Sequence, residues 1–309
     1  MKRLLKKIVI LTGLVICTIL FLNFQYTETD FFQNKDGIGK FFHVPYELEM
    51  VNLGTSYGEF GFDYSVIPVK GFNLAMEAQH PYYDLSILIH FQSHLLPGAV
   101  VLIPISFYSL GLGTGEGDYV FQTRNHRYYR FLEPDQILDF HTWEFLKYKI
   151  FPVFFANGNL ARIIWDGVPE GKLYLGENQF LPSEMEKRGW ERVESLLSLT
   201  DESHFEENAA IFREIVKLCK ASGFQPVFIA TPVTTWFFNA LPPDILENSD
   251  QLIHSLSEEL NVPYLDYSQD PDFYEEMDLF LDTDHLNLTG RKLFTQKVFH
   301  ELEPLFDKH

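Results

Sequence analysis

Apolar and polar positions along the chain predict strands and helices in alternation. Short apolar segments bounded by turn residues predict strands at 49–53, 72–74, 99–105, 226–230 and 263–266. Apolar residues at helical spacing predict helices at 81–95, 205–222, 244–260 and 289–302. Because strands that alternate with helices usually pair in parallel, this order predicts an α/β fold with a mainly parallel sheet.

Residues 111–204 interrupt this rhythm. They are rich in aromatic residues and contain several helix-like pieces, such as 141–151. We interpret them as an insertion or lid on the same domain. The predicted organisation is therefore a membrane segment at 1–25, a stalk at 26–46, and one domain at 47–309 that carries the insertion.

The N-terminus carries a positively charged start followed by a long apolar run. Lys2, Arg3, Lys6 and Lys7 precede residues 8–27, which contain no charge. This length is at the low end for a spanning helix and long for a signal-peptide core, and no small-x-small cleavage site follows. The pattern favours an uncleaved signal anchor in the cell membrane, with the bulk of the chain outside the cytoplasm. A cleaved signal peptide and a buried helix of a soluble domain are the alternatives.

Composition narrows the classes of function. The 309 residues are 46% hydrophobic, which supports a large core and excludes a disordered chain. Asp and Glu number 43 against 24 Lys and Arg, a net charge of −19, so no basic footprint for nucleic acid exists. Two cysteines, Cys17 and Cys219, are too few for a disulfide framework or a cysteine zinc site.

A serine follows the first predicted strand. The strand ends at Gly54, and the sequence continues Thr55 and Ser56. Ligands of parallel α/β sheets bind beyond the carboxyl ends of strands, so Ser56 lies where function is expected. The alternative is that Ser56 only caps a helix N-terminus.

A second candidate segment precedes the last predicted helix. Asp282 and His285 are three residues apart, a spacing that lets the carboxylate reach Nδ1 while Nε2 faces outward. Asp284 is adjacent to the histidine, so we expect its side chain to point away, towards solvent or the next helix N-terminus. The alternative is that both aspartates simply cap and solvate a turn.

Together the two segments resemble blocks of the SGNH/GDSL hydrolase superfamily. The first block there is Gly-x-Ser after the first strand, here Gly54 to Ser56, and the last is Asp-x-x-His, here Asp282 to His285. The resemblance spans about 48–305 and implies a three-layer α/β/α sandwich. Gly-Thr-Ser in place of Gly-Asp-Ser, together with the anchor, is similar to membrane-anchored branches. These include the teichoic acid D-alanyl transfer protein and alginate-type O-acetyltransferases.

The resemblance also implies a role for each site residue. Ser56 would be the nucleophile, His285 the general base and Asp282 its orienting carboxylate. The oxyanion would be held by the N–H groups of Ser56 and Ala78 and by the Ser106 hydroxyl. Two positions depart from the family pattern, because Ala78 stands at the usual glycine and Ser106 at the usual asparagine.

The sequence thus favours a membrane-anchored serine acyl-ester hydrolase or O-acyltransferase. Its implied partners are a cell-surface polysaccharide or teichoic acid, modified by D-alanylation or O-acetylation, and a membrane-bound O-acyltransferase. Acyl transfer through a serine needs no cofactor or metal. The alternative is a non-catalytic SGNH-fold partner that docks on a membrane-bound O-acyltransferase and guides the polymer.

Overall fold

The computed structural model describes residues 2–114, 125–156, 160, 164 and 182–306. The chain divides into two compact units, one formed by Met1–Phe42 with Gly117–Leu173 and the other by His43–Glu116 with Tyr174–His309. The second unit holds the sheet and all the candidate site residues, so the candidate active site lies within it.

The second unit is built on one parallel five-stranded sheet. Its strands lie in the order β2-β1-β3-β4-β5, and every neighbouring pair is parallel. Their bounds are β1 Leu48–Asn52, β2 Gly71–Asn73, β3 Leu95–Pro104, β4 Gln225–Ala230 and β5 Tyr264–Asp266. The predicted strands and the predicted parallel α/β class are confirmed. The strand order reverses between β1 and β3, which is where such sheets bind ligands.

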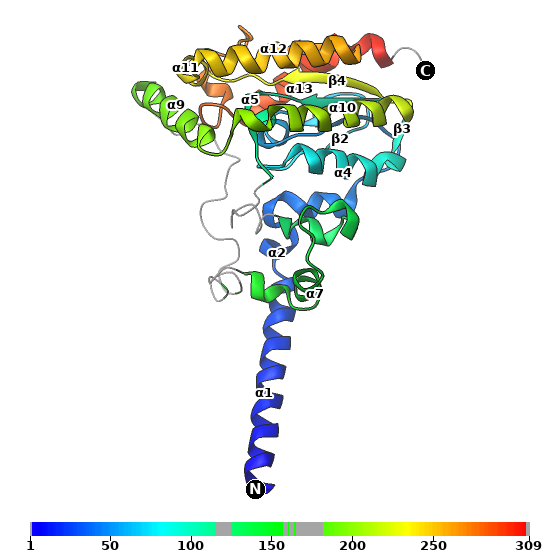
Figure 1. The fold of residues 1–309 in the computed structure, drawn as a ribbon, viewed down its shortest axis with the longest axis vertical. Coiled ribbons are helices and arrows are strands. Elements are labelled where there is room, and N and C mark those ends of the chain that lie inside the picture. The colour runs from blue at the N-terminus through cyan, green and yellow to red at the C-terminus, as the bar shows by residue number, and fades with distance from the viewer. Residues whose placement is uncertain (1, 115–124, 157–159, 161–163, 165–181, 307–309) are drawn as a thin grey trace. The chain divides into compact units, whose positions relative to one another are not determined.

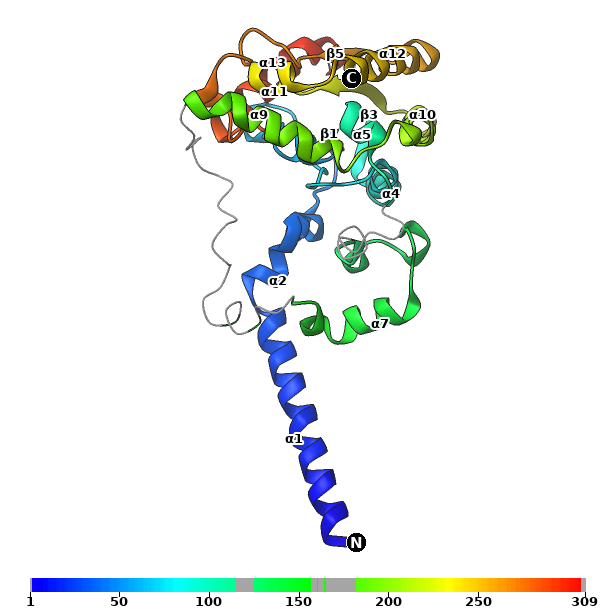
Figure 2. The same cartoon turned by 60° about the vertical axis from the view of Figure 1, so that its left-hand side comes forward.

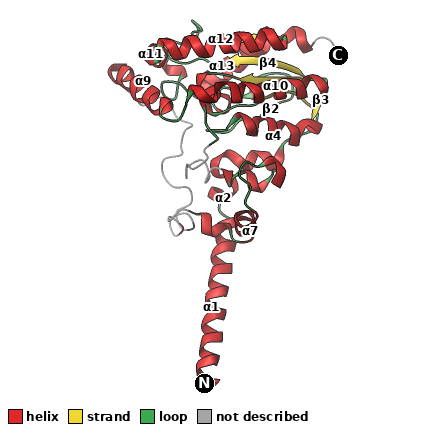
Figure 3. Cartoon of the chain, in the orientation of Figure 1, coloured by secondary structure: helices red, strands yellow, loops and turns green. Residues whose placement is uncertain are grey.

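Helices cover both faces of this sheet (Figures 1 and 2). On one face α10 packs against α4, α12 and β4, and α13 packs on the other face. Their bounds are α4 Pro81–Phe91, α10 Phe205–Ala221, α12 Pro243–Leu260 and α13 Leu288–Phe306. The expected three-layer α/β/α sandwich is therefore confirmed, and Figure 3 shows the helices around the strands.

Alternate residues of each strand point into the two halves of the core. Met50 and Ile229 belong to one cluster with Phe294 of α13. On the other side, Phe228 of β4 meets Phe212 of α10 edge to face, with ring centroids 6.3 Å apart. This two-sided burial explains why the central strands are almost wholly apolar.

Short helices follow the carboxyl ends of three strands. They are α3 Ser56–Glu59 after β1, α5 Phe107–Gly111 after β3 and α11 Thr235–Ala240 after β4. Each begins at a capping hydroxyl, provided by Thr55, Ser106 and Thr234 respectively. These caps fix where the chain leaves the sheet and so position the loops that carry polar side chains.

The segment expected as one insertion, 111–204, is divided between the two units. Residues Gly117–Leu173 cluster with Met1–Phe42, whereas α9, Pro182–Leu197, packs against α11 in the second unit. Residues 115–124, 157–159, 161–163 and 165–181 of it lie outside the described part of the chain. The remaining elements are α7 Thr142–Ile150, η2 Tyr64–Val66, η3 Gln92–His94, η4 Tyr128–Arg130, η5 Pro134–Gln136, η6 Pro152–Phe155, η7 Glu202–His204 and η8 Met277–Leu279.

The first unit begins with one long apolar helix, α1, Lys2–Thr27. At about 1.5 Å per residue its 26 residues extend about 39 Å, enough to cross a hydrocarbon core of about 30 Å. Its large apolar side chains are exposed. The stalk expected at 26–46 is mostly helical, because α2 Asp30–Asn34 and η1 Lys35–His43 follow α1 directly.

Candidate active site

Ser56 begins the short helix α3, and its neighbour Thr55 is the residue that caps it. The Thr55 hydroxyl accepts a hydrogen bond from the Tyr57 N–H at 3.4 Å. Ser56 is buried, and its hydroxyl makes no hydrogen bond within the described residues. Since Thr55 performs the capping, the Ser56 hydroxyl is left available for chemistry.

The turn before Ser56 depends on Gly54. Its φ is +112°, and a Cβ there would come within 3.0 Å of the Pro104 ring, so only glycine fits without strain. The Gly54 N–H donates to the buried Asp84 carboxylate at 2.7 Å, and the Gln79 amide donates to the same oxygen. Burial raises the pKa of Asp84 to about 7, although both hydrogen bonds oppose the shift.

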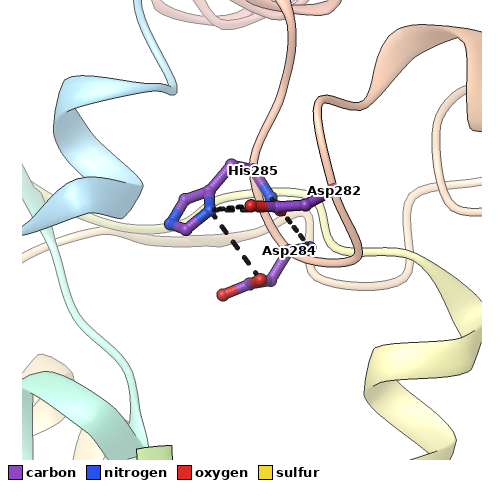
Figure 4. Close-up of side chains that lie close together, drawn as sticks. All are labelled: Asp282, Asp284 and His285. Atoms are coloured by element: carbon purple, nitrogen blue, oxygen red, sulfur yellow. Dashed lines mark hydrogen bonds and ion pairs between the residues drawn. The ribbon is translucent and has the colours of Figure 1, made fainter. Parts of the chain in front are cut away.

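His285 is oriented by Asp282, as the sequence predicts. Nδ1 lies 2.8 Å from one Asp282 oxygen, and Nε2 points away from both nearby carboxylates (Figure 4). Asp282 also accepts the backbone N–H groups of Asp284 and His285, so it caps the turn as well. The Nε2 atom is buried and has no hydrogen-bond partner among the described residues.

Two charges control the protonation of His285. Burial lowers its pKa, but the Asp282 and Asp284 carboxylates outweigh burial, and the pKa lies above its ordinary value. For Asp282, burial opposes ionisation, but the charge and hydrogen bond of His285 hold the pKa below its ordinary range. Ionised Asp282 keeps a proton on Nδ1, which leaves the Nε2 lone pair to accept one.

Asp284 is fully buried, so the expectation that it points to solvent or the helix terminus is wrong. Its carboxylate lies 3.0 Å from Arg192 Nε of α9 and accepts a hydrogen bond from the Tyr57 hydroxyl at 3.2 Å. These partners compensate for its burial. Asn287 instead caps α13, because its side-chain oxygen accepts the N–H groups of Thr289 and Gly290.

The serine turn and the histidine loop lie side by side. Tyr57 packs against His285 with ring centroids 5.7 Å apart, and Phe60 does so at 5.0 Å. No hydrogen bond joins Ser56 to His285 within the described part of the chain. Catalytic hydrogen bonds are often loose without substrate, so this geometry remains compatible with a working pair.

Of the expected oxyanion residues besides Ser56, Ala78 follows β2 and Ser106 follows β3, the two strands on either side of β1. Ala78 has φ +50°, the left-handed conformation that favours glycine, so alanine preserves the backbone course expected of the family's glycine. Ser106 follows β3, and its hydroxyl accepts the Ser109 N–H at 3.4 Å as the cap of α5. That bond uses an acceptor site of the hydroxyl and leaves its hydrogen to be donated.

A pocket opens beside the serine turn. It lies at the carboxyl ends of β3, β4 and β5, and Thr55, Tyr57 and Ser106 form one end of it. None of Ser56, Asp282 and His285 lines it, and His285 lies instead on a smaller adjoining hollow between Tyr57 and Leu286.

The Asp282, Asp284 and His285 side chains also have donor atoms within 4.8 Å of one another, as a metal site would. A cation bound there would compete with Arg192 for Asp284 and with the Nδ1 hydrogen bond for Asp282. The donor set is therefore better suited to orienting a histidine than to holding a metal.

Three residues of this site were not found from the sequence. They are Arg192, Tyr57 and Asp84, which belong to elements far apart in the chain. Tyr57 directly follows Ser56, and that adjacency was the one available signal. Arg192 sits in a helix rich in charged residues, and Asp84 is the one carboxylate of the largely apolar α4.

Comparison with known proteins yields similarity only to solved structures. No family model and no curated protein sequence matches this chain. A GDSL-like lipase from Bacteroides thetaiotaomicron is similar at 10% identity over 84% of this chain and 88% of its own, with a TM-score of 0.35. A catalytic mutant of an acetylxylan esterase from Geobacillus stearothermophilus is similar at 11% identity over 84% of this chain and 95% of its own, with a TM-score of 0.37. The site residues, and not these likenesses, therefore carry the functional proposal.

Proposed function

We propose that this chain is an SGNH-type serine acyl-ester hydrolase or O-acyltransferase. The observation that carries the proposal is His285, whose Nδ1 is held by Asp282 while its buried Nε2 has no partner among the described residues. A buried basic nitrogen without a partner is costly, so it indicates a group that acts on a bound molecule. Tyr57, the residue after Ser56, packs against this histidine.

The proposed reaction has two halves. In the first, Ser56 Oγ attacks the ester carbonyl, its proton passes to His285 Nε2, and the C–O bond to the leaving alcohol breaks. The alcohol oxygen takes the proton from Nε2. In the second half, water or an acceptor hydroxyl gives its proton to Nε2 and attacks the acyl carbon, the bond from that carbon to Ser56 Oγ breaks, and Oγ takes the proton back from Nε2.

Negative charge develops on the carbonyl oxygen in both halves. The N–H groups of Ser56 and Ala78 and the Ser106 hydroxyl are proposed to hold it. The left-handed backbone at Ala78 supports this role, because it matches the conformation that a glycine adopts there.

The cellular role is proposed from the anchor and the resemblance. With α1 in the membrane and the catalytic unit outside, the acceptor or substrate would be an acylated polysaccharide or teichoic acid at the cell surface. A membrane-bound O-acyltransferase is the proposed partner that would deliver or receive the acyl group.

Active-site labelling tests the proposal. A fluorophosphonate should label the full-length protein in detergent micelles, and Ser56→Ala should abolish labelling and ester hydrolysis without changing thermal unfolding. Ser65→Ala, at an exposed serine, is the matched control and should label normally. Unchanged labelling of Ser56→Ala would contradict the assignment and direct attention to Ser106. No labelling of any form would favour the docking partner.

A further inference from the structure

We propose that α7 and η6 form a second membrane contact, which lies in the interface of the lipid bilayer beside the carboxyl end of α1. The outer face of this segment consists of Trp143, Leu146, Ile150 and Phe154, and all four side chains are exposed. The partner of this face is a lipid surface. The inference takes α1 as the membrane anchor, and it goes beyond the proposed function because it concerns the first unit and not the candidate active site.

The segment is apolar on its outer side as well as on its inner side. On the inner side Tyr148 is buried, and its ring centroid lies 5.9 Å from that of Tyr129 and 5.2 Å from that of Phe155. On the outer side Trp143 and Phe154 are 70% and 62% exposed. A helix that faces water normally has a polar outer side, so a continuous apolar one indicates an interaction surface.

The outer face has basic borders. Trp143, Leu146 and Ile150 are three and four residues apart, so they lie along one side of α7. At about 100° per residue, Lys147 and Lys149 lie on the two flanks of that side. Lysines so placed can reach lipid phosphates while their stems cover apolar surface. The chain as a whole has a net charge of −19, so this local arrangement is unlike its general surface.

Asn23 attaches the segment to α1. Its side-chain amide donates to the Ile150 carbonyl oxygen at 3.2 Å, and its side-chain oxygen accepts the Val153 N–H at 3.2 Å. Both polar atoms of this side chain are thus paired, as lipid surroundings require. Phe21 and Phe24, which flank Asn23 in α1, are exposed. The exposed apolar surface of α1 therefore borders that of α7 and η6, which lie beside its carboxyl end (Figures 1 and 2).

The attachment point determines the depth of the segment in the membrane. The uncharged run 8–27 extends about 30 Å at about 1.5 Å per residue, which is the thickness of a hydrocarbon core. Asn23 lies four residues before the end of this run, or about 6 Å along the helix axis. Interfacial helices bury their apolar face about 5–10 Å into the boundary of headgroups and acyl chains. The segment is therefore held at the depth at which such helices lie.

The composition of the outer face also favours lipid over a protein partner. Tryptophan is enriched at membrane interfaces, because its ring is apolar and its N–H can bond to headgroups or water. Trp143 is the most exposed of the four side chains and lies at the start of α7, while Ile150 lies where the helix meets α1. The indole is thus placed away from the attachment point, towards the edge of the segment.

Fluorescence quenching by brominated lipid tests the inference. The full-length protein would be reconstituted in phosphatidylcholine vesicles, with and without bromine near the headgroup end of the acyl chains. We expect Trp143 to be quenched, so Trp143→Phe should remove most of the quenched emission. Trp190→Phe is the matched control and should leave the quenching in place, because Trp190 is also exposed but lies among the charged residues of α9. Equal quenching of the unaltered protein and Trp143→Phe would overturn the inference.

Two further variants test how the segment is held. Asn23→Leu removes both hydrogen bonds to the segment but keeps α1 apolar, so the quenching of Trp143 should fall. Gln25→Leu, at another polar residue of α1, is its matched control and should leave the quenching unchanged. Ile150→Glu should also lower the quenching, because a carboxylate is costly among acyl chains. Full quenching in both Asn23→Leu and Ile150→Glu would contradict the contact described.

Fluorophosphonate labelling separates this inference from the proposed function. Protein that floats with the vesicles and is labelled at Ser56, but whose Trp143 is not quenched, would contradict the lipid contact alone. The outer face would then fit a protein partner. Protein with quenched Trp143 that is never labelled would contradict the proposed function and leave the lipid contact standing.

Discussion

Asp282 and Asp284 are two positions apart but have opposite surroundings. Asp282 is about one-third exposed and holds His285 Nδ1, whereas Asp284 is completely buried against Arg192 and Tyr57. Asp284 lies 3.8 Å from Nδ1 and so contributes charge but no hydrogen bond to the histidine. Substitution of Asp282 should therefore impair turnover, and substitution of Asp284 should impair stability.

The first prediction separates them. Asp282→Asn should lower turnover roughly 100-fold or more, at least about 2.7 kcal/mol of barrier, because the histidine loses its orienting carboxylate. Asp284→Asn should instead lower the free energy of unfolding by roughly 2 kcal/mol, because Arg192 loses its buried partner. Steady-state kinetics and chemical denaturation would measure both. The reverse pattern of losses would contradict these two roles.

The second prediction concerns pH. General-base catalysis needs neutral His285, and the two carboxylates raise the pKa of this histidine. We therefore expect kcat/KM to increase with pH, with an apparent pKa above 6.5. The Arg192 charge lowers the pKa of His285, so Arg192→Gln should move this limb to higher pH. Lys187→Gln, at an exposed position of the same helix, should leave the limb in place. A limb unmoved by Arg192→Gln would argue against this electrostatic role.

The third prediction concerns Asp84. Its pKa is about 7 when folded and about 3.9 when unfolded, so between these values only the folded state keeps the proton. Stability should therefore fall as pH rises from about 4 to about 7, by up to roughly 4 kcal/mol. Asp84→Asn removes this fall while its side-chain oxygen still accepts the Gly54 N–H. Unfolding measured at pH 5 and pH 8 checks it, and an identical pH dependence in both proteins would contradict it.

At the scale of elements, helix α9, for which the sequence predicted no chemistry, contributes a side chain to the candidate site. It packs against α11, and Gly189 allows the close approach, since a Cβ there would lie 2.5 Å from the Trp236 carbonyl oxygen. Arg192 lies three residues further along the same helix and reaches Asp284. The position of α9 on α11 thus determines whether the buried carboxylate is paired.

The fourth prediction tests this dependence. Gly189→Ala should destabilise the fold by roughly 1–3 kcal/mol through overpacking, which outweighs the gain of about 1 kcal/mol in helix propensity. Chemical denaturation would measure this loss. Glu186→Ala, at an exposed position of α9, should cause none. A stabilised Gly189→Ala protein would show that α9 does not pack as described.

The regular elements were predictable because their patterns are local. The helix predicted at 205–222 ends within one residue of α10, and the strand predicted at 226–230 begins within one residue of β4. The short helices α3, α5 and α11 were not predicted. Each has four to six residues, too few to show a helical period, and each depends on one capping hydroxyl.

At the scale of the whole molecule, charge and hydrophobicity are unevenly distributed. The four positive charges at 2–7 precede the apolar part of α1, so the rest of the chain is even more acidic than the net −19 of the whole. The apolar side chains of α1 are exposed, which suits contact with lipid. This distribution predicts an anchored protein with its acidic part outside the cytoplasm.

The fifth prediction tests that orientation. Protease added to cells stripped of their wall should degrade the chain beyond about residue 30, while a cytoplasmic marker protein stays intact, because the positive-inside pattern directs the acidic part outwards. Washing with high salt or carbonate should leave the protein in the membrane fraction. Protection of the chain until the cells are lysed would mean that the orientation is the opposite.

By itself, the sequence determined the alternating elements, the parallel sheet, the apolar N-terminal helix and the residues Ser56, Asp282 and His285 as candidates. These follow from periodicity, from continuous apolar runs and from spacings within a few residues, all of which are local properties. Only the tertiary structure decided that Asp284 is buried with Arg192, that Asp84 holds the serine turn, and that a pocket lined by Thr55 and Tyr57 opens beside that turn. The contact between Arg192 and Asp284 joins side chains 92 residues apart, and a charged residue on a helix has the same local pattern whether it meets water or a buried partner.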